Sequence, residues 1–435
     1  MIIRYNIAIT IFLLYLTGYA CAKGQQASQT TSVSDWINIQ NRGASKIITE
    51  DSFIKPFNTD SHDFFGWSIA VSGETIVVGA PIEGSDTTGV NTSDGSDNNR
   101  VSGAAYVFVR ENDTWVQQAY LKPQYTNDAL EFGTSVDISG NTIVIGAPGD
   151  NRAATGVNSV PINFEELTSG AVYVFVRNGN TWTQQADFKA SNTYIGSSFG
   201  HSVAIDNNTI IVGAYGEPSD GSSQNDISTP DAGAAYIFNR MGNTWMQQAY
   251  LKPSIIDVEN RFGLSVAVSG DTAVVGAAYE EGSDGSINPN AIVDAGAAYV
   301  FKRTDTSWTE QARLEPSLIN NGDNFGFSCG VSGDAIMVGA RHFDGSSINA
   351  GRVFVFDRVN NIWDQSQILS SNNGGNFGWA MDMDGDLAIV GARGETVNTV
   401  TEIENGAIYT YQKIAGTWQR QKVLRVSSKT KMTIF

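Results

Sequence analysis

The residues that could do acid–base or nucleophilic chemistry are scattered along this chain. Its three histidines are His62, His201 and His342, and no serine or cysteine nucleophile recurs beside them. The sequence contains no HExxH and no cluster with the spacing of metal ligands. We therefore predict no catalytic residue and no metal ligand. The acidic residues leave room for an alternative, a carbohydrate-active enzyme that uses a pair of carboxylates.

Aromatic side chains at one repeated position are better candidates for binding. The position follows a recurring Phe-Gly pair and holds Trp67, Thr134, His201, Leu264, Phe327 and Trp379. If the repeats surround an axis, these residues ring one mouth of a central channel. Exposed aromatic rings there would stack on a sugar or a peptide. Our candidates are Trp67, His201, Phe327 and Trp379, and packing between repeats is the alternative role.

Long polar loops are the second group of candidates. They span Pro81–Ser102, Pro148–Ser169, Tyr215–Ala232, Ala278–Ala295, Arg341–Ala350 and Arg393–Asn405, and contain many Asp, Asn, Ser and Gly residues. Loops on a rigid scaffold often carry binding residues. We include Asp86 and Asp284 as candidate ligand-binding residues. The alternative is that the loops are solvated connectors that bind cations weakly.

All of these candidate residues belong to a sequence unit that is repeated along the chain, and this unit must position them. Phe-Gly pairs occur at Phe65, Phe132, Phe199, Phe262, Phe325 and Phe377, and a tryptophan closes each unit at Trp115, Trp182, Trp245, Trp308, Trp363 and Trp418. Each unit contains four short apolar segments. In the fourth unit they are Leu264–Val268, Thr272–Gly276, Ala297–Lys302 and Trp308–Leu314. Gly-Asp and Gly-Asn turns separate them as in tight hairpins, and the second and third segments are almost wholly apolar.

Four antiparallel strands, graded from apolar to polar and repeated at a near-fixed period, predict an all-β fold, a β-propeller of four-stranded antiparallel blades. We expect one propeller over residues 47–426, with units beginning near 65, 132, 199, 262, 325 and 377. Ile47–Pro56 matches the end of a unit, so a fourth-type strand precedes the first Phe-Gly. The six complete units form either six blades with an added edge strand or seven blades, with seven slightly favoured.

The net charge of the chain argues against two classes of partner, nucleic acids and anionic lipids. The chain has 27 Lys and Arg against 45 Asp and Glu, a formal net charge of −18. Sequence-independent nucleic-acid binding depends on neutralising phosphates, so we predict no nucleic-acid partner and no docking on anionic lipid.

The N-terminus predicts export. An apolar run at Ile7–Leu16 precedes Ala20-Cys21-Ala22, an A-x-A cleavage pattern, so residues 1–22 read as a signal peptide that is too short for a membrane span. Acylation of Cys21 as a lipid anchor is the alternative. Residues 23–46 form a polar leader and residues 427–435 a tail outside the repeat. No other segment predicts a transmembrane span, and Cys329 is expected to be a buried free thiol.

The units resemble the FG-GAP repeat, the blade of the integrin α-subunit head and of many bacterial exported proteins. The resemblance rests on Phe65-Gly66 followed by Gly79-Ala80-Pro81, with five further Phe-Gly and Gly-Ala pairs in order; only the first two units keep the proline. The family often holds calcium in a loop between its first two strands, and here that loop is shortened to a turn such as Ser72-Gly73-Glu74. Asp382-Met383-Asp384-Gly385-Asp386 comes closest to the calcium pattern but is too short to surround an ion. We therefore expect no cofactor, with weak calcium binding still open.

Together these features favour a secreted, periplasmic or cell-surface scaffold without enzymatic activity. It would bind a protein or glycan ligand at the cell surface through the long loops of one face, which in the integrin-type head share the ligand-binding side with the Phe-Gly turns. A structural subunit of a surface assembly and the carbohydrate-active enzyme are the alternatives.

Overall fold

The structure is a computed structural model that describes residues 54–58, 60, 62–92, 101–126, 128–281, 293–345, 348–371, 373–395 and 406–425. Several predictions lie outside these residues: the signal peptide, Cys21, the polar leader over 23–46, Asp284 and the tail over 427–435. Within the described ranges, no helix is long and apolar enough to cross a bilayer.

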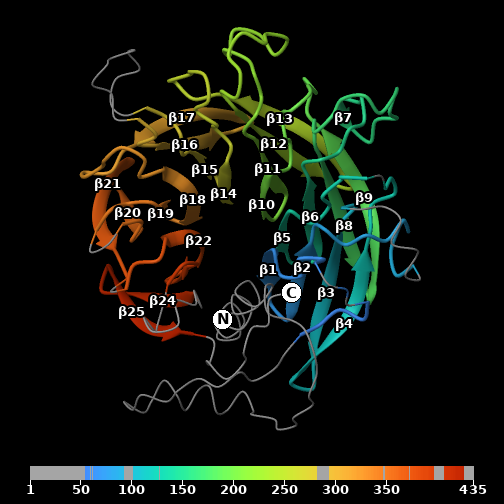
Figure 1. The fold of residues 1–435 in the computed structure, drawn as a ribbon, viewed down its shortest axis with the longest axis horizontal. Coiled ribbons are helices and arrows are strands. Elements are labelled where there is room, and N and C mark those ends of the chain that lie inside the picture. The colour runs from blue at the N-terminus through green and yellow to red at the C-terminus, as the bar shows by residue number, and fades with distance from the viewer. Residues whose placement is uncertain are drawn as a thin grey trace.

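Six antiparallel sheets surround a common axis and form a β-propeller, as predicted (Figure 1). Blade 1 contains β1 (Ser68–Ser72), β2 (Thr75–Ala80), β3 (Ala104–Glu111) and β4 (Thr114–Leu121). Blade 2 contains β5 (Ser135–Ser139), β6 (Thr142–Ala147), β8 (Ala171–Asn178), β9 (Thr181–Lys189) and the short outer β7 (Gly156–Val157). Blade 3 contains β10 (Ser202–Asp206), β11 (Thr209–Ala214), β12 (Ala234–Met241) and β13 (Thr244–Leu251).

The other three blades repeat this order. Blade 4 contains β14 (Ser265–Ser269), β15 (Thr272–Ala277), β16 (Ala297–Thr304) and β17 (Ser307–Leu314). Blade 5 contains β18 (Phe325–Ser332), β19 (Ala335–Ala340), β20 (Arg352–Val359) and β21 (Ile362–Leu369). Blade 6 contains β22 (Phe377–Asp384), β23 (Leu387–Ala392), β24 (Ala407–Ile414) and β25 (Thr417–Leu424).

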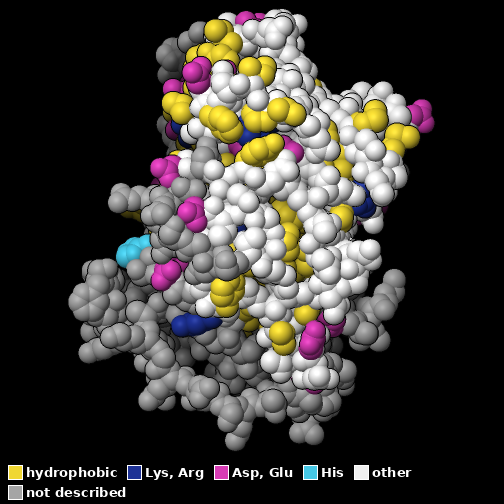
Figure 2. Space-filling model, turned by 90° about the vertical axis from the view of Figure 1, so that its right-hand side faces the viewer, with side chains coloured by type: hydrophobic (Ala, Val, Ile, Leu, Met, Phe, Trp, Pro, Cys, Tyr) yellow, Lys and Arg dark blue, Asp and Glu magenta, His cyan; other side chains and the backbone are white. Residues whose placement is uncertain are grey.

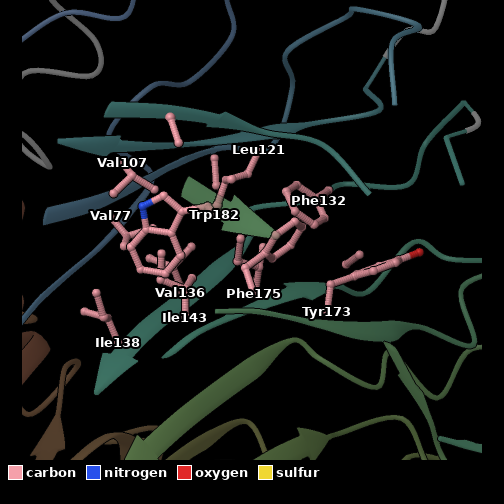
Figure 3. Packing of buried hydrophobic residues seen from close by; sticks show 14 of the residues in the cluster. Val77, Val107, Leu121, Phe132, Val136, Ile138, Ile143, Tyr173, Phe175 and Trp182 are labelled. Carbon is pink, nitrogen blue, oxygen red and sulfur yellow. The ribbon is translucent and has the colours of Figure 1, made fainter. Parts of the chain in front are cut away.

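The core lies between blades, because the second strand of each is covered on both faces. All six residues of β2 are buried, as its continuous apolar sequence predicted. Figure 3 shows one such interface: Val77, Val107 and Leu121 of blade 1 pack against Phe132, Phe175 and Trp182 of blade 2, among others. The Phe of the Phe-Gly pair therefore does wedge between neighbouring blades.

The glycines of the repeat mark a close approach of two backbones. A Cβ on Gly146 would lie 1.9 Å from the carbonyl oxygen of Gly200, the glycine of the next Phe-Gly pair. Ser135 Oγ donates a hydrogen bond to that same carbonyl, at 2.8 Å. Four other blades repeat this serine–carbonyl bond, from Ser68, Ser202, Ser265 and Ser328. Glycine is thus required here because a side chain would separate the blades.

Each recurring tryptophan also joins two blades. Trp182 is buried, and its Nε1 donates to Gln118 Oε1 of blade 1 at 2.8 Å. Arg177 stacks over the Trp182 ring, 5.1 Å from its centroid, and donates to Thr75 Oγ1 of blade 1 at 3.0 Å. The same pair of contacts recurs at the next three interfaces, through Trp245, Trp308 and Trp363. The predicted structural role of these tryptophans is therefore seen directly.

The described residues form six blades, and they do not form the seventh that the sequence slightly favoured. Part of the predicted extra strand, Ile54–Pro56, is described and has no strand pairing. Ile54 is nevertheless buried in the cluster of blade 1 around Tyr106. Phe57 N donates to Gln117 Oε1 of β4 at 3.1 Å, as Gln124 N does to Gln184 of the following blade. This segment therefore contacts blade 1 in the same way that the segment after β4 contacts blade 2.

Candidate ligand-binding face

The Phe-Gly turns and the long loops lie at the same end of the blades. Each Phe-Gly turn lies beside the last residues of the second strand of its blade. In blade 1, for example, Gly66 N donates a hydrogen bond to Gly79 O at 3.0 Å. The residue before each Phe has a positive φ, between 52° and 57°, in all six units: Phe64, Glu131, Ser198, Arg261, Asn324 and Asn376. A bond such as that from His201 N to Ser198 O (3.0 Å) then closes the turn. This fixed turn places the residue after each Phe-Gly at the channel mouth.

The structure brings two of the predicted binding residues together. The rings of Phe327 and Trp379 lie 5.3 Å apart, and both side chains are half-buried. His201 contacts the ring of Tyr215 edge to face at 4.7 Å, and burial lowers the pKa of His201 to about 4. It is therefore neutral at physiological pH.

The other predicted residues do not take part in these contacts. Trp67 is 39% exposed and stacks on Phe64 of its own turn, with ring centroids 5.8 Å apart. Asp86 is exposed in the loop after β2, where Thr126 Oγ1 donates to its carbonyl at 3.4 Å. Asp284 lies outside the described residues.

Sequence reasoning missed three arginines at this mouth. Arg341 lies over the rings of Phe327 (3.6 Å) and Trp379 (4.8 Å). Arg393 lies over Trp379 at 4.5 Å. Arg261 lies over Tyr279 at 4.5 Å and over Tyr215 at 5.9 Å. Arg341 and Arg393 directly follow the Gly-Ala of their units and Arg261 precedes a Phe-Gly, so a comparison of these two positions across the units would have found them.

These arginines have no salt-bridge partner among the described residues of an acidic protein. Among the described residues, none of the three forms a salt bridge, and the buried Nε atoms of Arg261 and Arg341 have no hydrogen-bond partner. Burial lowers the pKa of Arg341, Tyr279 opposes that shift, and the charge of Arg393 adds to it. Asp294 interacts with Arg261 electrostatically, which lowers the pKa of Asp294 against a larger rise from burial. Elsewhere, the side of the molecule in Figure 2 shows scattered acidic side chains with few basic ones between them.

One acidic residue at the base of the loop is buried in five of the six blades, so these loops are not solvated connectors along their whole length. Glu83 is 2% exposed, and the equivalent residues Asp150, Glu217, Glu280 and Glu395 are buried as well. In blade 3, Glu217 accepts hydrogen bonds from Lys252 Nζ (2.9 Å) and Tyr250 Oη (2.9 Å). Asn192 Nδ2 also donates to Glu217, at 2.7 Å. These acids hold the loop bases to the blades and are not available to a ligand.

Blade 5 replaces this polar cluster with an apolar one. Phe343 occupies the position of Glu217, and Phe354 occupies that of Tyr236. The two rings contact each other at 6.1 Å, and both residues are buried. Ser370 stands at the position of Lys252. Ile368 stands at the position of Tyr250, so the acid, the tyrosine that donates to it and its lysine are absent as a set.

Two carboxylates on the innermost strands have raised pKa values. Burial raises the pKa of Asp137 to about 7 and that of Asp382 to about 6. Both oxygens of Asp137 accept backbone N–H bonds, from Ile138 (2.7 Å) and from Ile205 of blade 3 (2.6 Å). Asp137 thus joins two blades, a structural use of the carboxylate.

The stretch Asp382–Asp386 is mostly strand. Asp382 and Asp384 belong to β22, and the turn itself holds Gly385 and Asp386. Across the described ranges, no group of three or more His, Cys, Asp or Glu side chains is arranged to hold a metal ion. Cys329 is a buried free thiol, as predicted.

The comparisons with known proteins address the family. No curated protein is significantly similar to this chain in sequence. Among solved structures, a putative 6-phosphogluconolactonase from Bacteroides uniformis ATCC 8492 is similar with a TM-score of 0.49 and 9% identity, over 83% of this chain and 85% of that one. That likeness says nothing about activity. The profile of the FG-GAP repeat matches residues 49–108, 115–175, 182–238, 245–301 and 308–356, more than half of the chain. The chain therefore belongs to the FG-GAP repeat family.

Proposed function

We propose that this protein is an exported binding or adhesion scaffold, without enzymatic activity, whose ligand docks on the face made by the long loops. The ligand is a protein or a glycan at the cell surface. The rigid ring supports this proposal, because successive blades are joined by buried apolar clusters and by repeated hydrogen bonds. Binding residues in loops above such a scaffold need little reorganisation when a ligand docks.

The observation that carries the proposal is an apolar loop in blade 2. Four apolar side chains of this loop, between β6 and β8, are each more than half exposed: Val160 (81%), Ile162 (87%), Phe164 (51%) and Leu167 (60%). Single exposed apolar residues are common on proteins, whereas four within eight positions of one loop favour contact with a partner. The loop is itself ordered by backbone bonds, as from Ile162 N to Ala153 O at 2.9 Å.

A metal-free, non-catalytic role agrees with the chemistry of the described side chains. The buried acids of the loop bases are already neutralised by lysine or arginine, as Glu217 is by Lys252. His201, with a pKa of about 4, is a weak general base.

Binding of the full chain to glycan and peptide arrays tests the proposal. One variant replaces Val160, Ile162, Phe164 and Leu167 with serine. The matched control replaces Met241, Val359, Ile362 and Ile414 with serine, because these exposed apolar residues occupy hairpins at the opposite end of the blades. We expect hits with the unchanged protein that the loop variant loses and the control keeps. The absence of any hit, or hits lost only by the control, would contradict the proposed face. Sequencing the N-terminus of the exported protein tests cleavage after Ala22.

A further inference from the structure

An unbroken series of arginine and aromatic side chains runs along the channel mouth from blade 3 to blade 6. His201 contacts Tyr215, and Arg261 bridges Tyr215 and Tyr279. Arg341 Nη2 then approaches Tyr279 Oη at 3.5 Å. We call this series the mouth arc; it consists of His201, Tyr215, Arg261, Tyr279, Phe327, Arg341, Trp379 and Arg393. On blade 2 the corresponding positions hold Glu131, Thr134 and Pro148, so the arc occupies one side of the mouth only.

We propose that the mouth arc is the binding site for an acidic saccharide, a sugar chain whose units carry carboxylate groups. The inference rests on the proposed function, because it uses the same face of the propeller, and it adds the ligand class and the residues that hold the ligand.

The guanidinium groups are set up to receive anions. An aromatic ring covers one face of each group, at 3.6 Å for Arg341 and at 4.5 Å for Arg261 and Arg393. Stacking on a ring leaves the in-plane N–H donors directed past its edge, where they match the two oxygens of a carboxylate. The described surroundings supply no carboxylate in a salt bridge with these groups. An incoming anion would therefore displace no salt bridge of the described residues.

Repulsion between the arginines also favours the binding of an anion. Arg341 and Arg393 flank the ring of Trp379 at 4.8 Å and 4.5 Å, and the charge of Arg393 disfavours the charged form of Arg341. A bound anion relieves this repulsion, so the arc gains more from a negative ligand than from a neutral one. The buried, unpaired Nε atoms of Arg261 and Arg341 show that the protein itself leaves part of each group unsatisfied.

A saccharide fits the arc better than an acidic peptide. Tyr215, Tyr279 and Trp379 alternate with the arginines and are half-buried, and aromatic rings of this kind stack on the C–H faces of sugars. An extended peptide usually adds a strand to an open sheet edge. The arc instead consists of side chains at strand ends and turns, such as the turn before β22 that holds Asn376.

The test is calorimetric titration of the full chain with tri-galacturonic acid. Its fully methyl-esterified form and a capped hexa-glutamate peptide serve as comparison ligands. Titrations are run at ionic strengths of about 0.02 M and about 0.15 M, because screening weakens contacts between exposed charges. The variants are Arg393→Gln and Arg341→Gln. Arg420→Gln is the matched control, since Arg420 is an exposed arginine on the outer strand of the same blade as Arg393.

We expect the acid trimer to bind and its methyl ester to bind at least tenfold more weakly. Each mouth-arc variant should lose about tenfold in affinity or more, while Arg420→Gln stays within twofold of the unchanged protein. Arg393 is exposed, so Arg393→Gln keeps the test valid if Arg341→Gln lowers the melting temperature. Equal binding of the acid and its ester, no binding of the acid, or equal binding of hexa-glutamate would overturn the inference. Array hits that depend on the blade 2 loop but not on these arginines would leave the proposed function standing without the mouth arc.

Discussion

Replacing Lys252 with methionine should lower the free energy of unfolding of this propeller by more than the loss of one charge suggests. The three protons of Lys252 Nζ are all used, by Glu217 Oε2 (2.9 Å), Ser219 O (2.7 Å) and Gly233 O (2.7 Å). The Glu217 side chain has no exposure and that of Lys252 has 8%. Methionine keeps most of the volume but leaves the carboxylate of Glu217 buried without its cation. Tyr250 and Asn192 still donate to it, and neither carries charge.

The expected cost is set by the uncompensated charge. Removing one partner of a buried ion pair costs about 3–5 kcal/mol. Burial already lowers the pKa of Lys252, and the attraction of Glu217 opposes that shift, so the pair is held by a balance between desolvation and charge. Blade 5 indicates that the whole set can be replaced at once, because Phe343, Ile368 and Ser370 occupy the positions that Glu217, Tyr250 and Lys252 hold in blade 3. We therefore expect the triple variant Glu217→Phe, Tyr250→Ile, Lys252→Ser to cost about 2 kcal/mol less than Lys252→Met alone.

The assay is equilibrium unfolding in guanidinium chloride, followed by tryptophan fluorescence and by circular dichroism, whose transitions should coincide. Lys302→Met is the control, since Lys302 is a partly exposed lysine of β16 whose Nζ contacts Asn361 Oδ1 at 3.4 Å, and it should cost less than about 0.5 kcal/mol. A cost below about 1 kcal/mol for Lys252→Met would refute the argument from buried charge. A triple variant less stable than Lys252→Met would refute the inference from blade 5.

Three further outcomes follow from the geometry. Gly146→Ala should lower the free energy of unfolding by about 3 kcal/mol, because its Cβ would lie 1.9 Å from Gly200 O. The turn variant Gly140→Ala has open space around its Cβ and a φ of +58°, so it should cost only about 1 kcal/mol. Equal costs of the two variants in thermal unfolding would contradict this reading. The pKa of Asp137 is raised from 3.8 to about 7, so its contribution to stability is present below pH 3.8 and is lost as the pH rises towards 7. Asp137→Asn should therefore flatten the fall in stability between pH 4 and pH 7 by about 1–3 kcal/mol, a discounted figure because the side chain keeps some exposure, and an unchanged slope would contradict it. Calcium titration should give no stoichiometric binding and no rise in melting temperature; a stabilising one-to-one complex would overturn the metal-free proposal.

The fold was predictable because the same pattern of strands and turns recurs six times in the sequence. The hairpin turns, the apolar second and third strands and the wedging Phe-Gly pairs all depend on local sequence, and each unit confirms the others. The number of blades was less predictable, because it depends on segments that do not repeat. Only Ile54–Pro56 of the extra strand is described, so the preference for seven blades has no support from the described residues.

The candidate site was predictable in position but not in composition. Phe327 and Trp379 were found because they occupy one repeated position, and the fixed turn brings them to the same mouth. Arg341 was missed because its contacts, with Phe327 of its own blade and with Trp379 of the next, join residues that are well separated in the sequence. The burial of Glu83 was not predicted, because a loop sequence rich in Gly and Ser does not show that the acid will pair with a lysine 39 residues later.

The blades recognise one another through serine, glycine, tryptophan and arginine contacts that lie on the strands and their hairpins, as between Trp182 and Gln118. The loop bases are held within their own blades, as Glu217 is by Lys252. Natural variation in the tips of the loops therefore costs the ring little, and selection for a new ligand can proceed without renewed selection for folding. Blade 5, with its apolar loop base and its short loop after Arg341, shows how far one unit has already diverged while its neighbours keep their place.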